Sequence, residues 1–256
     1  MQDTDSPRFT LLAGGSEVDD DGLPALYAYP DGLTSPWVRG NAITSLDGAA
    51  TTSGTSGGLG GAGDRRLFAV QRELADAIVV GAGTARAENY GGARMSVAQR
   101  RRRQARGQHE VPPIVLVTRS GLLDHDMPVL TDSEVPALVM TCAASFGIAR
   151  DRVGSAAEVV DCSGSDPDQV DLTVLLDQLG HRGLFRVLTE GGPSLMGAFM
   201  AATLLDELCL TAAPLLVGGG AVRIASGTVD VLTSMRRAHV LTDDDGYLYS
   251  RYVRVR

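Results

Sequence analysis

The chain has 256 residues with ordinary proportions of hydrophobic (44%) and charged (21%) side chains, as is typical of a globular protein. Its net charge of −8 argues against nucleic acid as the main partner, because nucleic-acid-binding surfaces are basic. No apolar run is long enough to span a membrane, and the polar start, MQDTDSPRFT, does not resemble a secretory signal. We therefore expect a cytoplasmic protein with neither a nucleic-acid nor a membrane partner.

Two further features of the composition limit the chemistry. The three cysteines, Cys142, Cys162 and Cys209, lie far apart, which favours a reducing compartment and gives neither a disulfide framework nor a zinc site. Arginine supplies all of the Lys+Arg count, and the chain contains no lysine. A Schiff-base lysine, a P-loop lysine and the Tyr-x-x-x-Lys pair of short-chain dehydrogenases are therefore excluded, and we expect no bound metal.

Residues 1–35 are acidic and rich in glycine and proline, and we interpret them as an extension that precedes a single domain, 36–256. The extension has three apolar residues that could order part of it: Leu23, Leu26 and Tyr27. No internal repeat and no linker between domains is visible in the rest of the chain.

The first half of the domain predicts a strand, a loop, a helix and a second strand. Residues 37–51 predict a strand that ends in the turn of Asp47 and Gly48, and the glycine-rich loop 53–64 ends in a helix cap at Asp64. The helix would carry an apolar stripe of Leu67, Val70 and Leu74. Residues 77–83, AIVVGAG, then predict a short buried strand that leads into glycines.

Residues 88–110 contain four consecutive arginines, Arg100 to Arg103. Like charges repel one another and need water, so a solvated helical or loop insertion is favoured over an anion-binding site. The purpose of this arginine run is left open at this point.

The second half alternates strands with helices. Strands are expected within 112–121, 136–142, 157–162 and 206–220. Residues 171–183 predict an amphipathic helix that Asp171 can cap, with an apolar face of Leu172, Leu175, Leu176 and Leu179 and an end at Gly180 or Gly183. Residues 238–256 predict a hairpin that turns at Asp245 and Gly246. This alternation predicts an α/β fold, a mostly parallel mixed sheet flanked by helices, with a C-terminal antiparallel hairpin at one edge.

The stretch FRVLTEGGPSLMGAF, residues 185–199, joins an apolar strand to a helix through two glycines. The first-turn amides of a helix have no intrahelical acceptor and the helix dipole favours negative charge there, so the pattern is typical of an anion site. Pro193 suits the first helical position and Ser194 adds a hydroxyl donor. A tight strand-to-helix turn without a ligand explains the same residues equally well.

Two other strand ends favour the anion site. VVGAGTARAEN repeats the strand-glycine-helix design with Gly81, Gly83 and Thr84, although Arg86 stands where a third glycine would complete G-x-G-x-x-G. The stretch IVLVTRSG ends a strand with Thr118, Arg119 and Ser120. The guanidinium of Arg119 is a forked donor between two hydroxyl groups, which suits the 2′-phosphate of NADPH. Three such ends predict a dinucleotide crevice at the carboxyl edge of the sheet.

Four motifs, ITSLDGAAT, GAGTARAEN, TEGGPSLMGAFMAATLLDEL and APLLVGGG, occur in an order and spacing that resemble the riboflavin-biosynthesis reductase family from about Trp37 to the C-terminus. That family includes the C-terminal half of the bacterial bifunctional deaminase–reductase and shares the dihydrofolate reductase fold. The resemblance implies an NADPH-dependent, homodimeric reductase. Its substrate would be a 5-amino-6-ribosylamino-pyrimidinedione phosphate, whose ribose is opened and reduced to a ribityl chain.

The resemblance also implies site residues. The cofactor-binding positions would be Ala42, Gly83, Thr84, Thr118, Arg119, Ser120, Glu190, Gly191, Gly192, Pro193, Ser194 and Leu195. The substrate-binding positions would be Asn41, Ser45, Asp47, Asn89 and Arg94.

The chain departs from the family in three ways. It has no zinc-deaminase signature. Asn41 stands where pathway members commonly carry lysine, four residues before Ser45. AENYGGARM replaces the family's Ala-Asp-Asn-Pro-x-Leu-Thr-Val-Arg, which leaves Asn89 and Arg94 as remnants of a clamp on the ribose phosphate. The cofactor half of the pattern fits better than the substrate half.

Hydride transfer needs one acid–base group beside the reacting carbon, and Asp47 and Glu190 are the candidates. We favour Asp47 facing the substrate over an Asx turn to its own backbone, whereas Glu190 could instead hold backbone amides or the loop 114–120. Two other functions stay open. The loss of the phosphate clamp favours a pteridine such as dihydrofolate as the substrate, and an NADPH-binding regulator without turnover would need no substrate.

Overall fold

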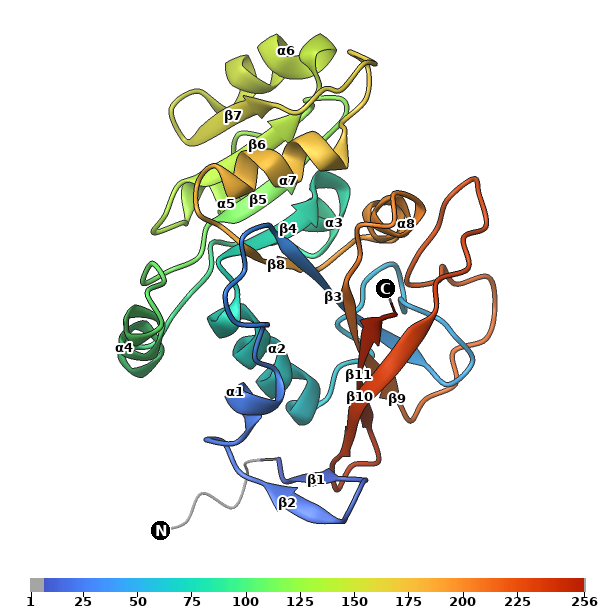
Figure 1. The fold of residues 1–256 in the computed structure, drawn as a ribbon. Coiled ribbons are helices and arrows are strands. Elements are labelled where there is room, and N and C mark those ends of the chain that lie inside the picture. Colours follow the sequence, from blue (N-terminus) through green and yellow to red (C-terminus); the bar gives the residue numbers. More distant parts are fainter. Residues whose placement is uncertain (1–6, 256) are drawn as a thin grey trace.

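The computed structural model describes residues 7–255, and residues 1–6 and 256, which we assigned to the extension and the domain end, lie outside this range. One sheet of 11 strands crosses the described part of the chain (Figure 1). Its parallel strands are β3 (Trp37–Ser45), β4 (Ala77–Gly81), β5 (Ile114–Val117), β6 (Ala137–Thr141), β7 (Ala157–Asp161), β8 (Arg186–Thr189) and β9 (Glu207–Ala213). Its antiparallel strands are β1 (Phe9–Leu11), β2 (Ser16–Val18), β10 (Met235–Thr242) and β11 (Leu248–Arg254).

The strand order is β2-β1-β10-β11-β9-β3-β8-β4-β5-β6-β7. Every pairing from β9 to β7 is parallel, and every pairing from β2 to β9 is antiparallel. The predicted mostly parallel mixed sheet is therefore confirmed. The hairpin of β10 and β11 forms as predicted but does not lie at the sheet edge, because β1 pairs with β10 and β2 extends the sheet further.

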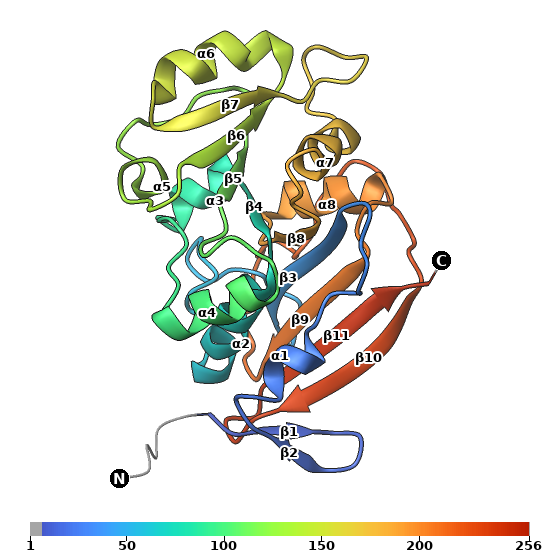
Figure 2. The ribbon, with the colours of Figure 1, turned by 60° about the vertical axis from the view of Figure 1, so that its left-hand side comes forward.

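Helices cover both faces of the parallel strands. Helices α7 (Leu172–Gly180) and α8 (Pro193–Ala201) lie on one side of β4 and β8, and α2 (Ala62–Leu74) and α3 (Ala82–Ala87) lie on the other (Figure 2). The remaining helices are α1 (Leu23–Leu26), α4 (Val97–Ala105), α5 (Pro128–Thr131) and α6 (Ala143–Val153). No helix in residues 7–255 is long and apolar enough to cross a membrane.

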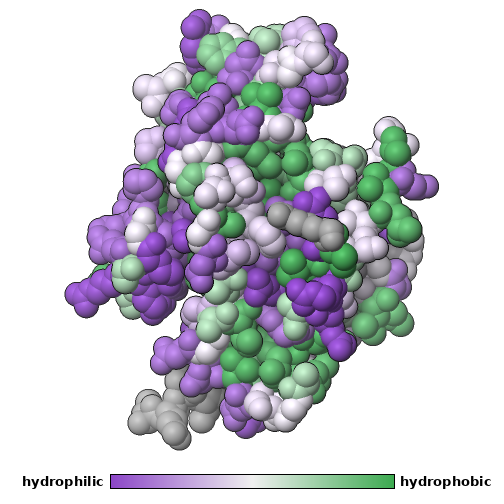
Figure 3. All heavy atoms as spheres, in the orientation of Figure 1, coloured by the Kyte–Doolittle hydropathy of each residue, from purple (hydrophilic) through white to green (hydrophobic). Residues whose placement is uncertain are grey.

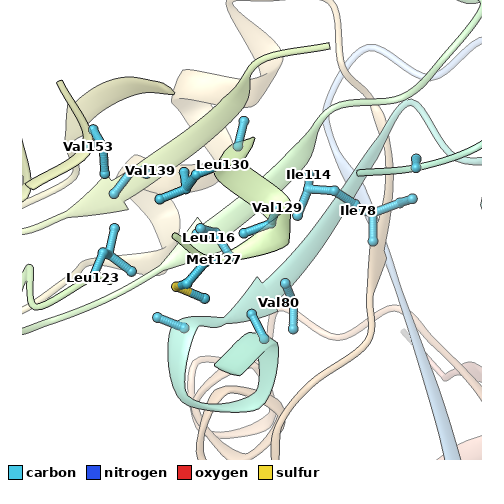
Figure 4. Packing of buried hydrophobic residues seen from close by; sticks show 14 of the residues in the cluster. Ile78, Val80, Ile114, Leu116, Leu123, Met127, Val129, Leu130, Val139 and Val153 are labelled. Carbon is cyan, nitrogen blue, oxygen red and sulfur yellow. The ribbon is translucent and has the colours of Figure 1, made fainter. Parts of the chain in front are cut away.

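The alternation of side chains along β4 shows why these strands are apolar on both faces. Ile78 and Val80 join one buried cluster, shown in Figure 4, and Ala77 and Val79 join a second cluster under α7 and α8. All four side chains are fully buried, as expected for a parallel strand between two helical layers. At about 25 cal/mol per Å² of buried apolar area, these two clusters provide the main driving force for folding.

The segment before β3 contributes to the same sheet. Strands β1 and β2 add to β10, and Leu23 and Tyr27 are buried in a third cluster against α2, with Leu26 half-buried at its border. The three apolar residues expected to order part of this segment therefore do pack against the domain, together with Phe9 and Tyr29.

Several local predictions are confirmed by side-chain contacts. The Asp171 carboxylate accepts hydrogen bonds from the amides of Thr173 (2.8 Å) and Val174 (3.4 Å) and caps α7, which ends at Gly180. Pro193 occupies the first turn of α8. The prediction of Asp64 as a helix cap was wrong, because α2 begins at Ala62 and Asp64 lies in its first turn.

The arginine run forms a helix, as one of the two alternatives predicted, but it is not fully solvated. Arg103 is completely buried and donates hydrogen bonds to the carbonyl oxygens of Glu73 (2.8 Å) and Ala75 (2.6 Å) at the end of α2. Arg102 makes a bidentate ion pair with Glu73 (2.8 and 2.7 Å). The run therefore fastens α4 to α2, and the physical reason is that the last carbonyls of a helix need donors.

Candidate functional site

A cavity of about 440 Å³ lies beside β3 and at the carboxyl ends of β4 and β8. It is lined by parts of β3, the glycine-rich loop, α2, α3 and the strand-to-helix turn after β8. The lining residues are Asn41, Ala42, Ile43, Ala50, Thr51, Gly54, Ser56, Asp64, Phe68, Gly83, Thr84, Ala87, Glu88, Tyr90, Glu190, Gly191, Gly192, Pro193, Met196, Val222 and Ile224. The cavity lies at the carboxyl edge of the sheet, where the crevice was predicted, and the turns after β8 and β4 line it whereas the turn after β5 does not.

The ends of β4 and β8 are joined by a hydrogen bond from the Gly81 amide to the Gly191 carbonyl oxygen (2.8 Å). The Gly192 residue that precedes α8 provides no side-chain cap, so the first-turn amides of α8 keep their donors for another partner. A Cβ at Gly83 or Gly191 would meet nothing within 4 Å, whereas a Cβ at Gly192 would lie 2.2 Å from Thr84 Oγ1. Bare backbone thus forms one wall of the cavity, and any side chain at residue 192 would displace Thr84.

Glu190 precedes this turn, and its side chain is 2% exposed. Its carboxylate accepts hydrogen bonds from Arg72 Nε and Nη2 (both 2.7 Å) and from the Tyr90 hydroxyl (2.9 Å). Burial, together with the neighbouring Glu190 charge, raises the pKa of Tyr90 well above its usual range. The idea that Glu190 holds backbone amides or the loop 114–120 was wrong, because α2 and the segment after α3 supply its partners.

Asp64 is a cavity residue that the sequence predictions did not include among the site residues. Asp64 lines the cavity, and burial raises the pKa of its carboxyl group, while a hydrogen bond with Thr211 and the charge of Arg65 partly offset that effect. The only signal in the sequence was an acid at the start of a helix, which a favourable helix dipole explains without any ligand. Its position became informative only when β9 brought Thr211 beside it.

Asn41 lies in the cavity wall, as the substrate-site prediction requires. Gln71 Nε2 donates a hydrogen bond to Asn41 Oδ1 (3.0 Å), which fixes the amide of Asn41. Because Asn41 Oδ1 already accepts the hydrogen bond from Gln71 on α2, the NH₂ group of Asn41 is the part of the side chain left to contact a ligand.

Asp47 is exposed and is not among the residues that line the cavity. Its carboxylate accepts hydrogen bonds from the Ser45 hydroxyl (2.5 Å) and from the amides of Val217 (3.1 Å) and Gly218 (2.7 Å). These donors, the Ser45 hydroxyl first, lower the pKa of Asp47 to about 2. Asp47 and Ser45 therefore tie the turn after β3 to the segment after β9.

The other predicted substrate residues lie outside the cavity lining. Asn89 is exposed at the end of α3 with φ of 52°, and Arg94 forms an exposed ion pair with Asp132. Glu88, which does line the cavity, accepts hydrogen bonds from the amide (2.7 Å) and hydroxyl (2.9 Å) of Ser56 and so anchors the glycine-rich loop.

The predicted 2′-phosphate residues follow β5, one strand away from the cavity wall at β4. Thr118 is buried, and its hydroxyl accepts a hydrogen bond from the Gly121 amide (3.2 Å). The Arg119 side chain is exposed, and its guanidinium makes no hydrogen bond or ion pair with any residue from 7 to 255. The Ser120 hydroxyl accepts a hydrogen bond from the Leu122 amide (3.3 Å). Leu195 packs at the border of the cluster under α8, and Ser194 is exposed beside it.

Comparison with known proteins places the chain in a family. A model of the RibD C-terminal domain matches residues 36–249. A riboflavin biosynthesis protein RibD from Bacillus amyloliquefaciens is 30% identical over 186 residues, 72% of this chain and 47% of that protein, so the chain spans about half of its length. A 2,5-diamino-6-ribosylamino-4(3H)-pyrimidinone 5′-phosphate reductase from Methanothermobacter thermautotrophicus is 31% identical over 185 residues, 72% of this chain and 80% of that protein.

The solved structure of a pyrimidine reductase-like protein from Corynebacterium diphtheriae superimposes with a TM-score of 0.77 at 29% identity and covers 86% of this chain and 92% of that chain. These matches confirm the resemblance that the motifs indicated and the dihydrofolate reductase-like architecture of the sheet. The chain belongs to the RibD C-terminal domain family.

Proposed function

We propose that this protein is an NADPH-dependent oxidoreductase that reduces a ribosylaminopyrimidine 5′-phosphate in riboflavin biosynthesis. The observation that carries the proposal is the cavity at the ends of β4 and β8, walled by the bare Gly191–Gly192 turn, in a member of this family. The archaeal relative is named as a reductase of such a phosphate.

The residues of the turn fit a dinucleotide. The space at Gly83 and Gly191 and the uncapped start of α8 suit a diphosphate, which Ser194 and Thr84 would contact with their hydroxyls. Ala42 in β3 would approach the nicotinamide, and its small side chain leaves room there. When bound, the cofactor supplies a hydride, and the chain's part is to orient the substrate and exclude water from the cavity.

Arg119 makes the cofactor preference testable. We expect Arg119→Ala to weaken NADPH binding about tenfold or more and to leave NADH binding nearly unchanged, because a guanidinium–phosphate contact is lost only with NADPH. Fluorescence titration with both cofactors measures this. Arg86→Ala is a suitable control, since Arg86 is an exposed arginine already paired with Asp124 (2.7 Å). Equal losses for NADPH and NADH would remove Arg119 from the 2′-phosphate site.

Asp47 remains our candidate for an effect on turnover, with a changed role. A carboxyl group with a pKa of about 2 is ionised at neutral pH and cannot donate a proton there. We expect Asp47→Asn to lower turnover, by up to about 100-fold, because the segment from Val217 onward that leads to Val222 and Ile224 in the cavity wall would shift. NADPH affinity should stay unchanged. Turnover equal to that of the wild type would remove Asp47 from the mechanism.

One observation favours a second candidate, reduction of a pteridine such as dihydrofolate. The cavity is lined by three carboxylates, and no arginine or histidine of the described chain is among its lining residues. The lining therefore offers no cationic side chain to pair with the substrate's phosphate dianion, whereas a pteridine carries no phosphate.

The loss of NADPH absorbance with each substrate in turn separates the candidates. Turnover of the pyrimidine phosphate alone supports the pathway reductase, and turnover of dihydrofolate alone supports the pteridine reductase. If neither substrate is reduced but NADPH raises the melting temperature, both proposed activities are overturned and the protein binds NADPH without turnover.

We also propose a homodimer, because apolar side chains are exposed on the segment between β9 and β10. Leu216 is 77% exposed and Leu232 is fully exposed, with Leu215 and Val229 nearby in sequence. Hydrophobic patches are visible on the right-hand side of the surface in Figure 3, where Figure 1 places this segment. Exposed apolar groups of this kind mark association surfaces.

A further inference from the structure

Of the three carboxylates that line the cavity, Glu190 alone makes an ion pair with a residue in the range 7–255. Glu190 is held by Arg72 and Tyr90, and Glu88 by Ser56. Asp64 makes no ion pair with any residue in the described part of the chain; its carboxyl group has a hydrogen bond with the uncharged Thr211, and the charge of Arg65 acts on it from farther away. Asp64 therefore has acceptor capacity left for a ligand, as Glu88 has at Oε2, and of these two acids only Asp64 lies on α2 one turn before Phe68.

A carboxylate in a half-buried wall is costly unless donors approach it. Removal from water disfavours its charged form, and the pKa of Asp64 is raised for that reason. An ionised carboxylate only accepts hydrogen bonds, and its two oxygens are spaced to take two parallel N–H groups. The complementary ligand edge is a ring N–H beside an exocyclic amino group.

We propose that Asp64 selects a substrate whose heterocycle is a 2-amino-4-oxopyrimidine, by accepting hydrogen bonds from its ring N–H and its 2-amino group. This rests on the proposed function, since it assigns a specificity residue in the same cavity. A 2,4-dioxopyrimidine presents a carbonyl oxygen in place of the amino group, so that two acceptors would face each other without a proton between them.

The surrounding wall suits a flat ring. Phe68 lies one helical turn after Asp64 on α2 and lines the same cavity, so its ring is on the same helix face. Asn41 adds an NH₂ donor from β3, which suits an oxo group on the heterocycle. The ring N–H beside a 2-amino group, which we propose that Asp64 binds, is present in diaminopyrimidinones and in pterins. It is absent from the pyrimidinedione implied by the family resemblance.

If the ring still carries its 2-amino group when the ribose is reduced, the hydrolytic deamination that replaces this amine by oxygen must act on the product of this enzyme. The reaction that supplies the substrate must then leave the 2-amino group in place.

Pterin and lumazine test the proposal by binding, without turnover, because the two rings differ only in the 2-amino or 2-oxo group. Calorimetry on the full chain with saturating NADPH should show pterin binding at least about tenfold tighter than lumazine. Asp64→Asn presents one acceptor and one donor, which match the N–H and C=O of lumazine, so the preference should reverse. Asp64→Ala should lose pterin affinity without gaining lumazine affinity. Asp151→Asn, an exposed acid on α6, is the matched control and should keep the wild-type preference.

The possible outcomes distinguish the failure of the role of Asp64 from the failure of the proposed function. Equal binding of pterin and lumazine by the wild type, or an unchanged preference in Asp64→Asn with an unchanged melting temperature, would overturn the role of Asp64. If the preference reverses but no pyrimidine or pteridine supports NADPH oxidation, the role of Asp64 stands and the proposed function fails. If NADPH oxidation occurs with the 2-oxo and 2-amino pyrimidine phosphates at equal efficiency, the role of Asp64 fails and the proposed function stands.

Discussion

Replacing Glu207 by alanine should lower the free energy of unfolding by about 3–5 kcal/mol, because it leaves a buried arginine without its counter-charge. Arg39 in β3 and Glu207 in β9 are both fully buried, and Arg39 Nε lies 2.5 Å from Glu207 Oε1. The carboxylate also accepts hydrogen bonds from Arg251 (2.9 and 3.0 Å) and from the Trp37 indole (3.2 Å). Glu207 on β9 is therefore the counter-charge of two arginines, Arg39 on β3 and Arg251 on β11.

Urea denaturation of the wild type, Glu207→Ala and Glu158→Ala measures this effect. Glu158 pairs with Arg182 at a site where the acid is 56% exposed, and exposed pairs contribute about 1 kcal/mol or less. A loss in Glu207→Ala no larger than that in Glu158→Ala would show that water compensates Arg39 in the folded state. Asn41 lies two residues after Arg39 on the same face of β3, so a variant that disturbs this strand should also bind substrate poorly.

The same cluster predicts a dependence of stability on pH. Burial opposes ionisation of Glu207, but Arg39 and Arg251 together outweigh burial and hold its pKa below the usual range. A carboxyl group whose pKa is lower in the folded state stabilises the protein above its unfolded pKa, about 4.3 for glutamate. The contribution is lost as pH falls further, and Glu207→Gln should remove that part of the acid sensitivity.

Those parts of the fold that depend on local pattern were predicted correctly. Helix α7 was predictable because Asp171 caps it and four leucines share its buried face. The hairpin of β10 and β11 was predictable because Asp245 and Gly246 supply turn conformations, Gly246 with φ of 85°. In both cases the signal lies within one element, where capping, turn chemistry and periodicity act.

Features that depend on distant partners were not predictable. Arg103 looked like one of four solvated charges, and it is buried because the carbonyls at the end of α2 need donors. The role of Glu190 was open because its partner Arg72 is 118 residues away in sequence. Asp64 looked like a cap because nothing in its neighbourhood along the chain shows that Thr211 and the cavity lie beside it.

The candidate site also contains features that the local sequence predicts and features that depend on distant residues. The glycine turns at the ends of β4 and β8 were predictable, because strand, glycine and helix start are consecutive and their meeting follows from parallel strand order. The predicted phosphate clamp was not assembled at the cavity: Asn89 and Arg94 lie outside its lining, and Arg94 is paired with Asp132. Sequence reasoning therefore predicted the meeting of the glycine turns, and it did not predict where Asn89 and Arg94 lie.

Gly192→Ala should weaken NADPH binding by about 10–100-fold while it leaves the fold intact. The new methyl group would lie 2.2 Å from Thr84 Oγ1, so the Thr84 hydroxyl must rotate into the space where we place the diphosphate. Gly192 has φ of −61°, which lies within the range that alanine adopts. The effect should thus appear in affinity and not in the melting temperature.

Gly147→Ala on α6 is the matched control, since a Cβ there would meet nothing within 4 Å. It should keep the wild-type affinity for NADPH and raise stability by up to about 1 kcal/mol, as alanine does within helices. Fluorescence titration and thermal melting of both variants give the comparison. Wild-type affinity in Gly192→Ala would mean that the diphosphate does not lie between Thr84 and the start of α8. The cofactor side would then have to be sought elsewhere on the carboxyl edge, where β5 and Arg119 are the next candidates.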